Sequence, residues 1–451
     1  MSLLQKIQEA GIVGQGGAGF PASVKLNVQV DILLINALEC EPLLNTDKYI
    51  MMNFPRLIVE AIIMVKEQVG AKEAVIGIKK VNTKCINAME RAITDIKAQD
   101  VRVFQSDDYY PSGDEQMVVF DITGRVVPQG GLPLNVGVVV SNVGTMLEIY
   151  RANQGKPLTH KFLTLTGEIN NPSVLKAPIG TSFGDCIQFG QHSLTDYKII
   201  SGGPFMGSIY NKDEVDKLFV TKTTSGIILT GDNNKNAAIK NINLKRVLNM
   251  AKSACIQCRM CTDLCPRHLI GHRLHPHKIM RMMSAAEFDG DQLTGCFIKA
   301  NKEILQEALI CCECSICETY ACPMDILPRQ VNIFVKNQFR REGFVFEKTK
   351  DVYPPHQVRE YRKINYKAIL ARMGLGDLIK KVNTYNEINP NRVYISLKQH
   401  IGKPAVPVVK QGDKVEQGQL IARADGEISA NIHASISGQI TEIENHIEIS
   451  S

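Results

Sequence analysis

The sequence contains no long apolar run, which excludes a membrane-spanning helix. No stretch approaches the roughly 18 to 20 apolar residues that a span needs. The N-terminal MSLLQKIQEAG also lacks the apolar core of a secretory signal peptide. Charge of either sign is not in marked excess, since 52 basic residues face 46 acidic ones, a balance of +6. This balance does not favour nucleic acid or a membrane surface as a partner. We therefore expect a cytoplasmic protein.

What is present is ordinary globular composition, with 44% hydrophobic and 22% charged residues. A chain of 451 residues is long enough for about two to four domains with cores of their own. Thirteen cysteines are unusual for such a chain, and most fall between Cys255 and Cys322. A disulfide framework is typical of small secreted proteins, so metal binding is the better interpretation.

Two cysteine runs share one spacing rule. The first is Cys255-x2-Cys258-x2-Cys261-x3-Cys265-Pro266, and the second is Cys311-x2-Cys314-x2-Cys317-x4-Cys322-Pro323. In two-cluster ferredoxins the first three thiolates of a run bind one [4Fe–4S] cluster and the fourth binds the other. The spacing thus predicts one cluster on Cys255, Cys258, Cys261 and Cys322, and a second on Cys311, Cys314, Cys317 and Cys265. The extra residue before Cys322 is expected to bulge the turn without removing a ligand.

Structural zinc is the main alternative, although it usually takes paired C-x2-C units. Cys312 lies off the spacing and is interpreted as a spectator, and Cys40, Cys85, Cys186 and Cys296 as packing residues. The histidines at 268, 272, 275 and 277, with Arg267 and Arg273, are interpreted as a solvated basic segment. Tandem clusters carry single electrons, whereas hydride donors deliver two, so a flavin is the expected converter.

The stretch GQGGAGF, residues 14–20, satisfies G-x-G-x-x-G, but its surroundings do not suit a Rossmann site. Residues 1–13 have helical periodicity, Pro21 suits the first turn of another helix, and the first buried strand comes later, within 31–42. A Rossmann fingerprint instead follows a strand. Helices at 54–70 and 84–98 then alternate with strands at 73–79 and 101–106, which predicts an α/β domain reaching about residue 150.

Beyond residue 157 the pattern becomes a small strand-rich unit with one short helix, then a connector at about 211–250. The cysteine-rich part is otherwise helical. The tail has short alternating strands with turn pairs at Gln411-Gly412, Gln417-Gly418, Asp425-Gly426 and Ser437-Gly438. It resembles the barrel-sandwich hybrid of lipoyl and biotinyl domains, but the hairpin tip ARADGEISANIHA has no lysine. A carrier role is therefore rejected.

Four motifs in order resemble the flavin-carrying, NADH-oxidising subunit of respiratory complex I and the related Rnf C subunits. They are GQGGAGFPASVK with NALECEP, YYPSGDEQMVV (109–119), LPLNVGVVVSNVGTML (132–147) and TLTGEINNPSVLKAPIGTSF (164–183). The last resembles a soluble-ligand-binding (SLBB-like) β-grasp domain. The chain departs from complex I members at Leu38, at LNVQV after Lys25 and at Ser141, which bears on the nicotinamide half.

The resemblance implies FMN, NADH as donor and a set of cofactor-binding residues. Glycines of the loop would let backbone N–H groups approach a phosphate, and Lys25 would add a positive charge. Asn36 would contact the flavin, and Glu39 and Glu41 would accept hydrogen bonds from ribose hydroxyls. The residues of 109–119 and of 132–147 would form two further cofactor loops. The full set is Gly14, Gly16, Gly17, Gly19, Lys25, Asn36, Glu39, Glu41, Tyr110, Gly113, Asp114, Glu115, Asn142 and Thr145. No side chain need act as a nucleophile.

The C-terminal place of the hybrid, the size and CTDLCPRHLIGHRLHPHKIM with ETYACPM resemble the cobalamin reductases of propanediol-utilising bacterial microcompartments. This implies reduction of cob(III)alamin or cob(II)alamin, free or on a corrinoid-carrying protein, to reactivate a diol dehydratase. An adenosyltransferase and shell proteins are further expected partners. Alternatives are an Rnf C-type electron-input subunit of a membrane ion-translocating complex, an electron supplier to an amino-acid (proline) reductase, and a scaffold with vestigial cofactor sites.

The expected architecture is a multidomain chain with an α/β flavin domain at its N-terminus. The expected ranges are 1–155 for the FMN/NADH-binding domain, 156–212 for the β-grasp domain, 213–247 for a connector, 248–335 for the helical two-cluster ferredoxin-type domain, 336–392 for a linker or helical segment and 393–451 for the barrel-sandwich hybrid.

Overall fold

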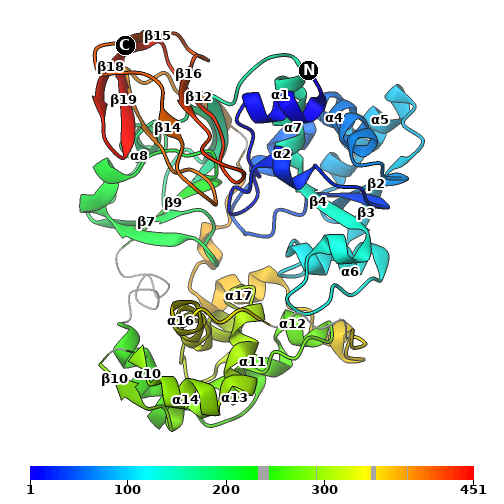
Figure 1. Cartoon of the computed structure of the whole chain (residues 1–451), viewed down its shortest axis with the longest axis vertical. Coiled ribbons are helices and arrows are strands. Elements are labelled where there is room, and N and C mark those ends of the chain that lie inside the picture. Colours follow the sequence, from blue (N-terminus) through cyan, green and yellow to red (C-terminus); the bar gives the residue numbers. More distant parts are fainter. Residues whose placement is uncertain (232–242, 291, 347–351, 383) are drawn as a thin grey trace. The chain divides into compact units, whose positions relative to one another are not determined.

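The chain divides into two compact units in the structure, a computed structural model that describes residues 1–231, 243–290, 292–346, 352–382 and 384–451 (Figure 1). Unit 1 takes residues 1–107, 137–232 and 377–451, and unit 2 takes 108–136 and 233–376. The segment 108–136 thus belongs to the same unit as the cysteine-rich part, although it lies between two strands of unit 1 in the sequence. Among the described residues, no helix is both long and apolar enough to cross a membrane.

Unit 1 begins with an α/β fold on a parallel sheet of order β3-β2-β1-β4. Three of its strands, β1, β2 and β4, are buried along most of their length, as parallel strands covered by helices are, whereas the edge strand β3 is buried mainly at its two ends. They are β1 (Ile32–Asn36), β2 (Glu73–Lys79), β3 (Val101–Ser106) and β4 (Val138–Asn142). The helices are α1 (Leu3–Glu9), α2 (Ala22–Lys25), α3 (Thr46–Asn53), α4 (Pro55–Gln68), α5 (Thr83–Ile96) and α7 (Val143–Asn153).

The alternation predicted for this part is confirmed. Strands β2 and β3 have the predicted bounds, and α4 and α5 lie within one or two residues of theirs. Helix α1 enters the glycine stretch and the short α2 leaves it, so the order that argued against a Rossmann site is the order seen. Helix α3 was not predicted.

A second sheet of unit 1 has the order β12-β6-β5-β9-β7-β8. Its strands are β5 (His160–Gly167), β6 (Ser173–Pro178), β7 (Tyr197–Ser201), β8 (Ser208–Asn211), β9 (Gly226–Gly231) and β12 (Thr384–Glu387), with α8 (Phe183–Gln188) and the 3-10 helix η2 (Lys212–Lys217) beside them. Strand β9 lies inside the range expected to be a connector. Because its apolar residues are buried between β5 and β7, it is a core strand, which corrects that expectation. Residues 232–242 of the same range lie outside the described residues.

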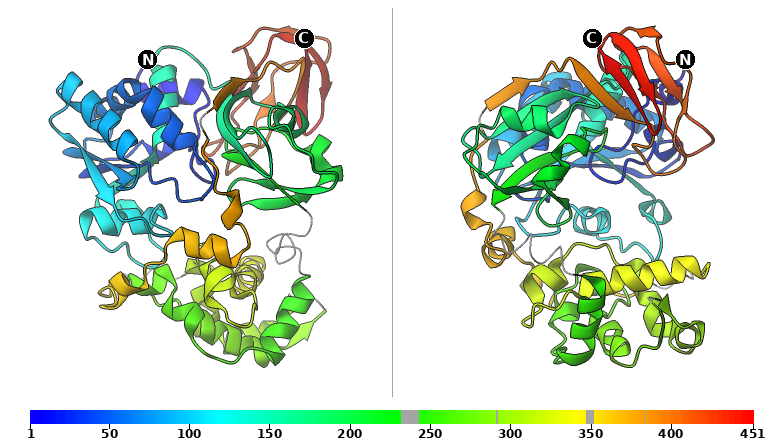
Figure 2. Two further views of the ribbon diagram at one scale, coloured as in Figure 1. Left: turned by 180° about the vertical axis from the view of Figure 1, so that it is seen from behind. Right: turned by 90° about the vertical axis from the view of Figure 1, so that its left-hand side faces the viewer.

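The C-terminal part of unit 1 consists of short strands in two sheets, beside the second sheet in Figure 2. The strands are β13 (Arg392–Ser396), β14 (Val406–Pro407), β15 (Lys414–Val415), β16 (Leu420–Arg423), β17 (Ile432–His433), β18 (Gly438–Ile443) and β19 (His446–Ser450). Three of the predicted turn glycines, Gly412, Gly418 and Gly426, adopt positive φ. The tip between β16 and β17 is docked rather than free, since the Asn431 carbonyl accepts a hydrogen bond from buried Lys222.

Unit 2 is mainly helical around its own apolar core. Its helices are α6 (Glu115–Thr123), α10 (Leu244–Ser253), α11 (Met260–Asp263), α12 (Pro266–Leu269), α13 (Pro276–Ser284), α14 (Gly295–Ala300), α15 (Lys302–Leu305), α16 (Pro328–Arg341) and α17 (Tyr366–Arg372). Shorter elements are the hairpin β10 (Phe288–Asp289) and β11 (Gln292–Leu293), and η1 (Pro133–Val136), η3 (Gln306–Ile310), η4 (Cys317–Ala321) and η5 (Arg359–Arg362).

Candidate functional site

The eight cysteines of the two spaced runs line two pockets of unit 2. One pocket is lined by Cys255, Cys258, Cys261 and Cys322. The other is lined by Cys265, Cys311, Cys314 and Cys317, with Cys312 beside them. Each pocket therefore combines three thiols of one run with the last thiol of the other, which is the grouping that the spacing predicts.

The two runs share a local backbone conformation. The residues before and after the second cysteine, Gln257 and Arg259 in one run and Glu313 and Ser315 in the other, all have positive φ between 55° and 68°. Non-glycine residues rarely adopt this left-handed region, and such strain is concentrated at ligand-binding loops. The extra residue of the second run is taken up by η4, which is a π-helix, the form that one inserted residue produces.

Solvent exposure distinguishes the two pockets. Cys258 is exposed and the other three thiols of its pocket are half-buried, whereas Cys265, Cys314 and Cys317 are buried. Hydrogen-bond donors approach two of the sulfur atoms. Gln257 Nε2 lies 3.2 Å from Cys255 Sγ, and the Glu313 amide lies 3.4 Å from Cys311 Sγ. Donors of this kind tune the potential of a cluster.

Arg267, His268 and His272 are buried, which corrects their interpretation as part of a solvated basic stretch, whereas Arg273 is exposed as predicted. The Arg267 Nη2 atom lies 2.9 Å from Asp114 Oδ2, and these side chains are 10% and 14% exposed. Burial alone would lower the pKa of Arg267, but the charge of Asp114 and the thiol of Cys312 raise it above its usual value. His272 contacts the Val127 carbonyl at 2.8 Å. The ring of His268 lies against that of His356 at a tilt of 31°, and burial lowers the pKa of His268 to about 3.

Unit 2 also holds four of the predicted cofactor residues, in the segment 109–119. Asp114 caps α6 by accepting from the amides of Gln116 and Met117. The hydroxyl of Tyr110 donates to the Cys314 carbonyl at 2.8 Å. Gly113 and Glu115 flank Asp114, on the turn that leads into α6. The predicted cofactor loop is therefore bonded to two cysteine-bearing segments.

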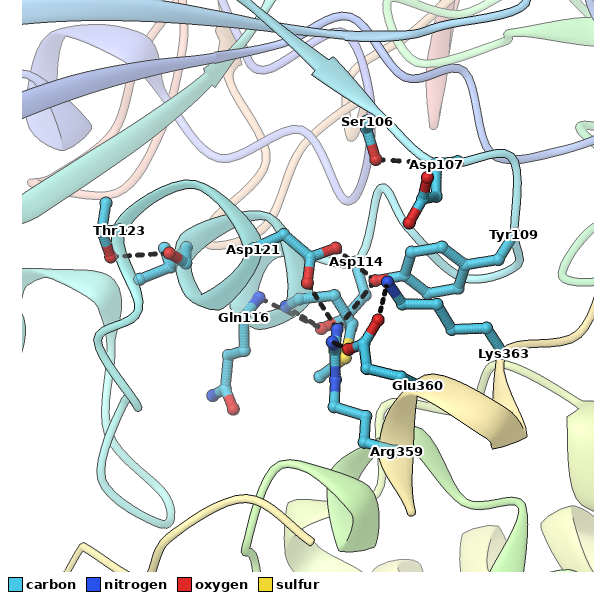
Figure 3. A network of polar contacts seen from close by, with 12 residues as sticks. Ser106, Asp107, Tyr109, Asp114, Gln116, Asp121, Thr123, Arg359, Glu360 and Lys363 are labelled. Carbon is cyan, nitrogen blue, oxygen red and sulfur yellow. Dashed lines mark hydrogen bonds and ion pairs between the residues drawn. The ribbon is translucent and has the colours of Figure 1, made fainter. Parts of the chain in front are cut away.

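A second polar network holds α6 to η5. Figure 3 shows Arg359 reaching both Asp121 and Tyr109, at 2.5 and 3.1 Å. Arg359 is buried, so the Asp121 carboxylate balances a charge that would otherwise be buried unpaired. Sequence patterns did not point to Arg267 or Arg359, because the partner of each lies more than 150 positions away in the chain.

The glycine loop lies in unit 1 and is exposed at Gly16, Gly17 and Ala18. Two positions need glycine for packing: a Cβ on Gly16 would lie 2.9 Å from Asn142 Nδ2, and Gly19 has φ of 73°. A Cβ on Gly17 would meet open space, so there the backbone is accessible to a ligand. The Gly14 amide closes the loop on the Phe20 carbonyl at 2.9 Å, and Lys25 is the half-buried last residue of α2.

Asn142 and Thr145 hold this loop and the end of β1 together. Asn142 caps α7 through Oδ1, while its Nδ2 donates to Asp47 Oδ2 at 2.9 Å and to the Asn36 carbonyl at 3.3 Å. Thr145 Oγ1 accepts from the Gln15 amide at 3.0 Å. Asn36 Oδ1 in turn accepts from the Leu38 amide. The structure thus links Asn36, Asn142 and Thr145 to the glycine loop.

The two predicted glutamates face different neighbours. Glu39 has a φ of 39° and accepts from the Asp47 amide through Oε1, while its buried Oε2 has no hydrogen-bond partner among the described residues. Burial raises the pKa of Glu39, against the nearby charge of Lys48. Glu41 accepts from the amides of Phe205 and Met206, in the turn between β7 and β8. Glu39 Oε2 lies 3.9 Å from Lys48 Nζ and lacks a hydrogen-bond donor among the described residues, whereas Glu41 holds the second sheet.

The residues present fit the expected groups. Each pocket offers four converging thiols, and burial raises the pKa of Cys261 to about 12, so a bound cation would favour loss of the Cys261 proton. In unit 1, exposed glycine amides and an orphaned carboxylate oxygen suit a nucleotide with a phosphate and hydroxyl groups.

Comparisons with known proteins agree with this geometry. The model of the Nuo51 FMN-binding domain matches residues 7–151, that of a 4Fe-4S dicluster domain matches 254–327, and that of the RnfC barrel sandwich hybrid domain matches 379–451. These matches and the site define an oxidoreductase that carries FMN and iron–sulfur clusters. The match over residues 379–451 confirms the barrel-sandwich hybrid that the sequence predicts for the tail.

The chain is 36% identical to the cobalamin reductase PduS of Citrobacter freundii, over 98% of this chain and 94% of that protein. The Salmonella typhimurium protein of the same name is also 36% identical, over 97% and 94%. The chain belongs to this family of PduS cobalamin reductases. The C subunit of a proton-translocating ferredoxin:NAD(+) oxidoreductase complex from Clostridium ljungdahlii is 37% identical, over 59% of this chain and 56% of that protein.

Proposed function

We propose that this protein takes electrons from NADH and reduces the cobalt of a corrinoid, either free cobalamin or a corrinoid held by another protein. The observation that carries the proposal is the pair of four-thiol pockets, in a chain that also has an FMN-binding domain. When bound, FMN links a two-electron hydride donor to the one-electron chemistry of iron–sulfur clusters. The names of the two full-length relatives support cobalamin as the acceptor.

The proposed cluster ligands are the eight pocket cysteines, one [4Fe–4S] cluster for each set of four. The chain's own part is to place and tune these groups. Three of the four cysteines in the pocket of Cys314 are buried, and the loop that carries Cys314 is bonded to the flavin-type segment through Tyr110. In the other pocket Cys258 is exposed to solvent. We infer that the pocket of Cys314 is the donor side and the pocket of Cys258 the acceptor side.

The proposed flavin and nicotinamide residues are the set predicted from the sequence. In unit 1 the contacts of Asn142 and Thr145 with the glycine loop support this set, and in unit 2 the cap of α6 by Asp114 supports it. Glu39 is the best supported ribose acceptor because Oε2 has no hydrogen-bond partner in the described part of the chain. Glu41 holds the β7–β8 turn in the same structure, so its ligand role is secondary.

The test is an anaerobic assay in which NADH is added to the reconstituted protein and flavin bleaching is followed together with cobalamin reduction. Cys261→Ala is expected to leave flavin reduction intact and to abolish cobalamin reduction, whereas Cys296→Ala, at an exposed cysteine outside both pockets, is expected to match the parent. Cobalamin reduction by Cys261→Ala at the parental rate would refute the proposal.

A second candidate is an electron-input subunit of an ion-translocating complex, favoured by the similarity to the Clostridium ljungdahlii protein and by the RnfC hybrid domain. It predicts copurification with membrane subunits. An electron supplier to an amino-acid reductase would reduce a protein partner and ignore corrinoids. The family also suggests a propanediol-utilisation microcompartment as location, with an adenosyltransferase or shell proteins as neighbours, and encapsulation is tested by copurification with shell proteins.

A further inference from the structure

A buried lysine on the second sheet of unit 1 reaches the glycine loop. Lys161 lies on β5 and is 5% exposed, and its Nζ donates a short hydrogen bond to Gln15 Oε1. Gln15 is the second residue of the loop GQGGAGF and is itself buried. A lysine is almost never fully buried unless it is paired, so this contact needs an explanation.

Gln15 is held at three points. Its side chain accepts from Lys161 and donates to the Val13 carbonyl at 3.5 Å, and its amide donates to Thr145 Oγ1. The next three residues, Gly16 to Ala18, are exposed. Lys161 is therefore joined, through the Gln15 side chain, to a loop whose following residues are open to solvent.

The charges that face Lys161 are mainly acidic. Asp47, on α3, and Glu148, on α7, interact with it electrostatically, and burial is the first cause that raises the pKa of both carboxyl groups, that of Asp47 to about 7. The charged groups next to these carboxylates are Glu39, Lys48, Arg151 and Lys176. Burial lowers the pKa of Lys161 to about 8, while the two carboxylates oppose that effect.

We propose that Lys161 is a positioning residue for the flavin phosphate. It holds the glycine loop in shape through Gln15, and its positive charge favours binding of the doubly charged phosphate group at the exposed residues of the loop. The proposal rests on the proposed placement of the flavin at this loop. Lys161 lies outside the range matched by the FMN-binding domain, so the second sheet completes the site that the first sheet begins.

The sign of the pH dependence follows from linkage. A bound dianion raises the pKa of both Lys161 and Asp47, so binding takes up protons, and affinity is highest where both groups are already protonated. As pH rises through about 7 and 8, the free protein loses these protons and FMN affinity falls. Riboflavin has no phosphate and should show little of this dependence.

The experiment is equilibrium dialysis of FMN and riboflavin against the full-length protein with its clusters in place and its flavin removed. Lys161→Met is expected to weaken FMN binding about tenfold or more, which corresponds to about 1.4 kcal/mol, and riboflavin binding less than about twofold. Lys161→Arg, which keeps a cation, should restore most of the FMN affinity and give a shallower fall above pH 8. Lys198→Met, on β7 of the same sheet, removes a lysine outside this group of charges, so it is the control and should match the parent.

Every outcome of this experiment either supports the proposed role of Lys161 or overturns it. Unchanged FMN affinity in Lys161→Met overturns the proposal, and so does an equal loss for FMN and riboflavin, since that loss is not specific to the phosphate. A Lys161→Met protein that does not fold is replaced by Lys161→Arg, whose pH profile must be shallower than the parent's. If the parent protein binds neither flavin, the proposed function itself fails, and the two failures are thereby distinguished.

Discussion

Replacing Asp114 is expected to loosen α6 because this side chain performs two separate tasks. Its Oδ1 caps the helix, with the Gln116 and Met117 amides at 3.1 and 3.3 Å. Its Oδ2 accepts from Arg267 at 2.9 Å, and side-chain exposures of 14% and 10% place this ion pair in the buried regime. The change therefore disturbs both the cofactor-type loop and the segment that follows Cys265.

The two tasks have different magnitudes. Asp114→Ala leaves a buried guanidinium without its counter-charge, which costs about 3–5 kcal/mol for a broken buried pair. Loss of the cap adds about 1 kcal/mol. Asp114→Asn keeps a capping oxygen and removes only the charge, so it should retain the cap contribution. Asp114→Asn combined with Arg267→Met removes the uncompensated charge and should recover part of the loss.

The assay is hydrogen exchange of the α6 amides, read by mass spectrometry on the full-length protein under anaerobic conditions. Hydrogen exchange reports the free energy of local opening, so the measurement does not require the two-unit protein to unfold in a single two-state step. The expected order of protection is parent, then Asp114→Asn, then Asp114→Ala. Asp107→Asn removes an exposed ion pair with Lys80 and should stay within about 1 kcal/mol of the parent. Parental protection of α6 in Asp114→Ala would refute this reasoning.

Two further predictions concern unit 1. Burial lowers the pKa of Lys222 from 10.5 to about 7, and its Nζ donates to the carbonyls of Gly11 and Asn431, with His400 and His433 nearby. Between pH 7 and 10 the unfolded chain holds this proton more often than the folded chain, so Lys222 makes the free energy of unfolding rise with pH, by up to about 1.4 kcal/mol per pH unit. Lys222→Met should therefore make the thermal midpoint depend less on pH. An unchanged slope would contradict the lowered pKa of Lys222. Glu41→Gln leaves one acceptor oxygen for two amides. The opening free energy at Phe205 and Met206 should fall by about 1–3 kcal/mol, so hydrogen exchange of these amides should be faster. Equal exchange rates in variant and parent would show that the carboxylate does not hold the turn.

Local patterns predicted much of the fold. Strands β2 and β3 were predicted with their bounds, β2 because a buried parallel strand appears as an apolar run and β3 because VRVFQS begins with alternating apolar and polar residues. Strand β9 was missed since its apolar run is short and a polar stretch follows it, and only its pairing with β5 and β7 makes it a core strand. Helix α3 has eight residues and little apolar periodicity, so no pattern indicated it.

In the candidate site, too, local patterns were predicted from the sequence and long-range contacts were not. Cysteine spacing predicted both groups of four thiols, because ligand spacing is a local constraint of cluster geometry. The buried partners of the site were not readable. Arg267 was interpreted as solvated, and its ion pair with Asp114 joins residues 153 positions apart. Lys161 was not singled out, since its partner Gln15 lies in the glycine loop, 146 positions away.

The exchange of the fourth cysteine between the runs is tested most directly by counting iron and acid-labile sulfide in anaerobically purified protein. The parent should hold about eight of each per chain, four for each [4Fe–4S] cluster. Cys261→Ala with Cys322→Ala removes two thiols from one pocket and should leave about four. Cys261→Ala with Cys265→Ala removes one thiol from each pocket and should leave fewer than that. The reverse order of these two double variants would contradict the exchange, and a parent with only trace iron would contradict the clusters themselves.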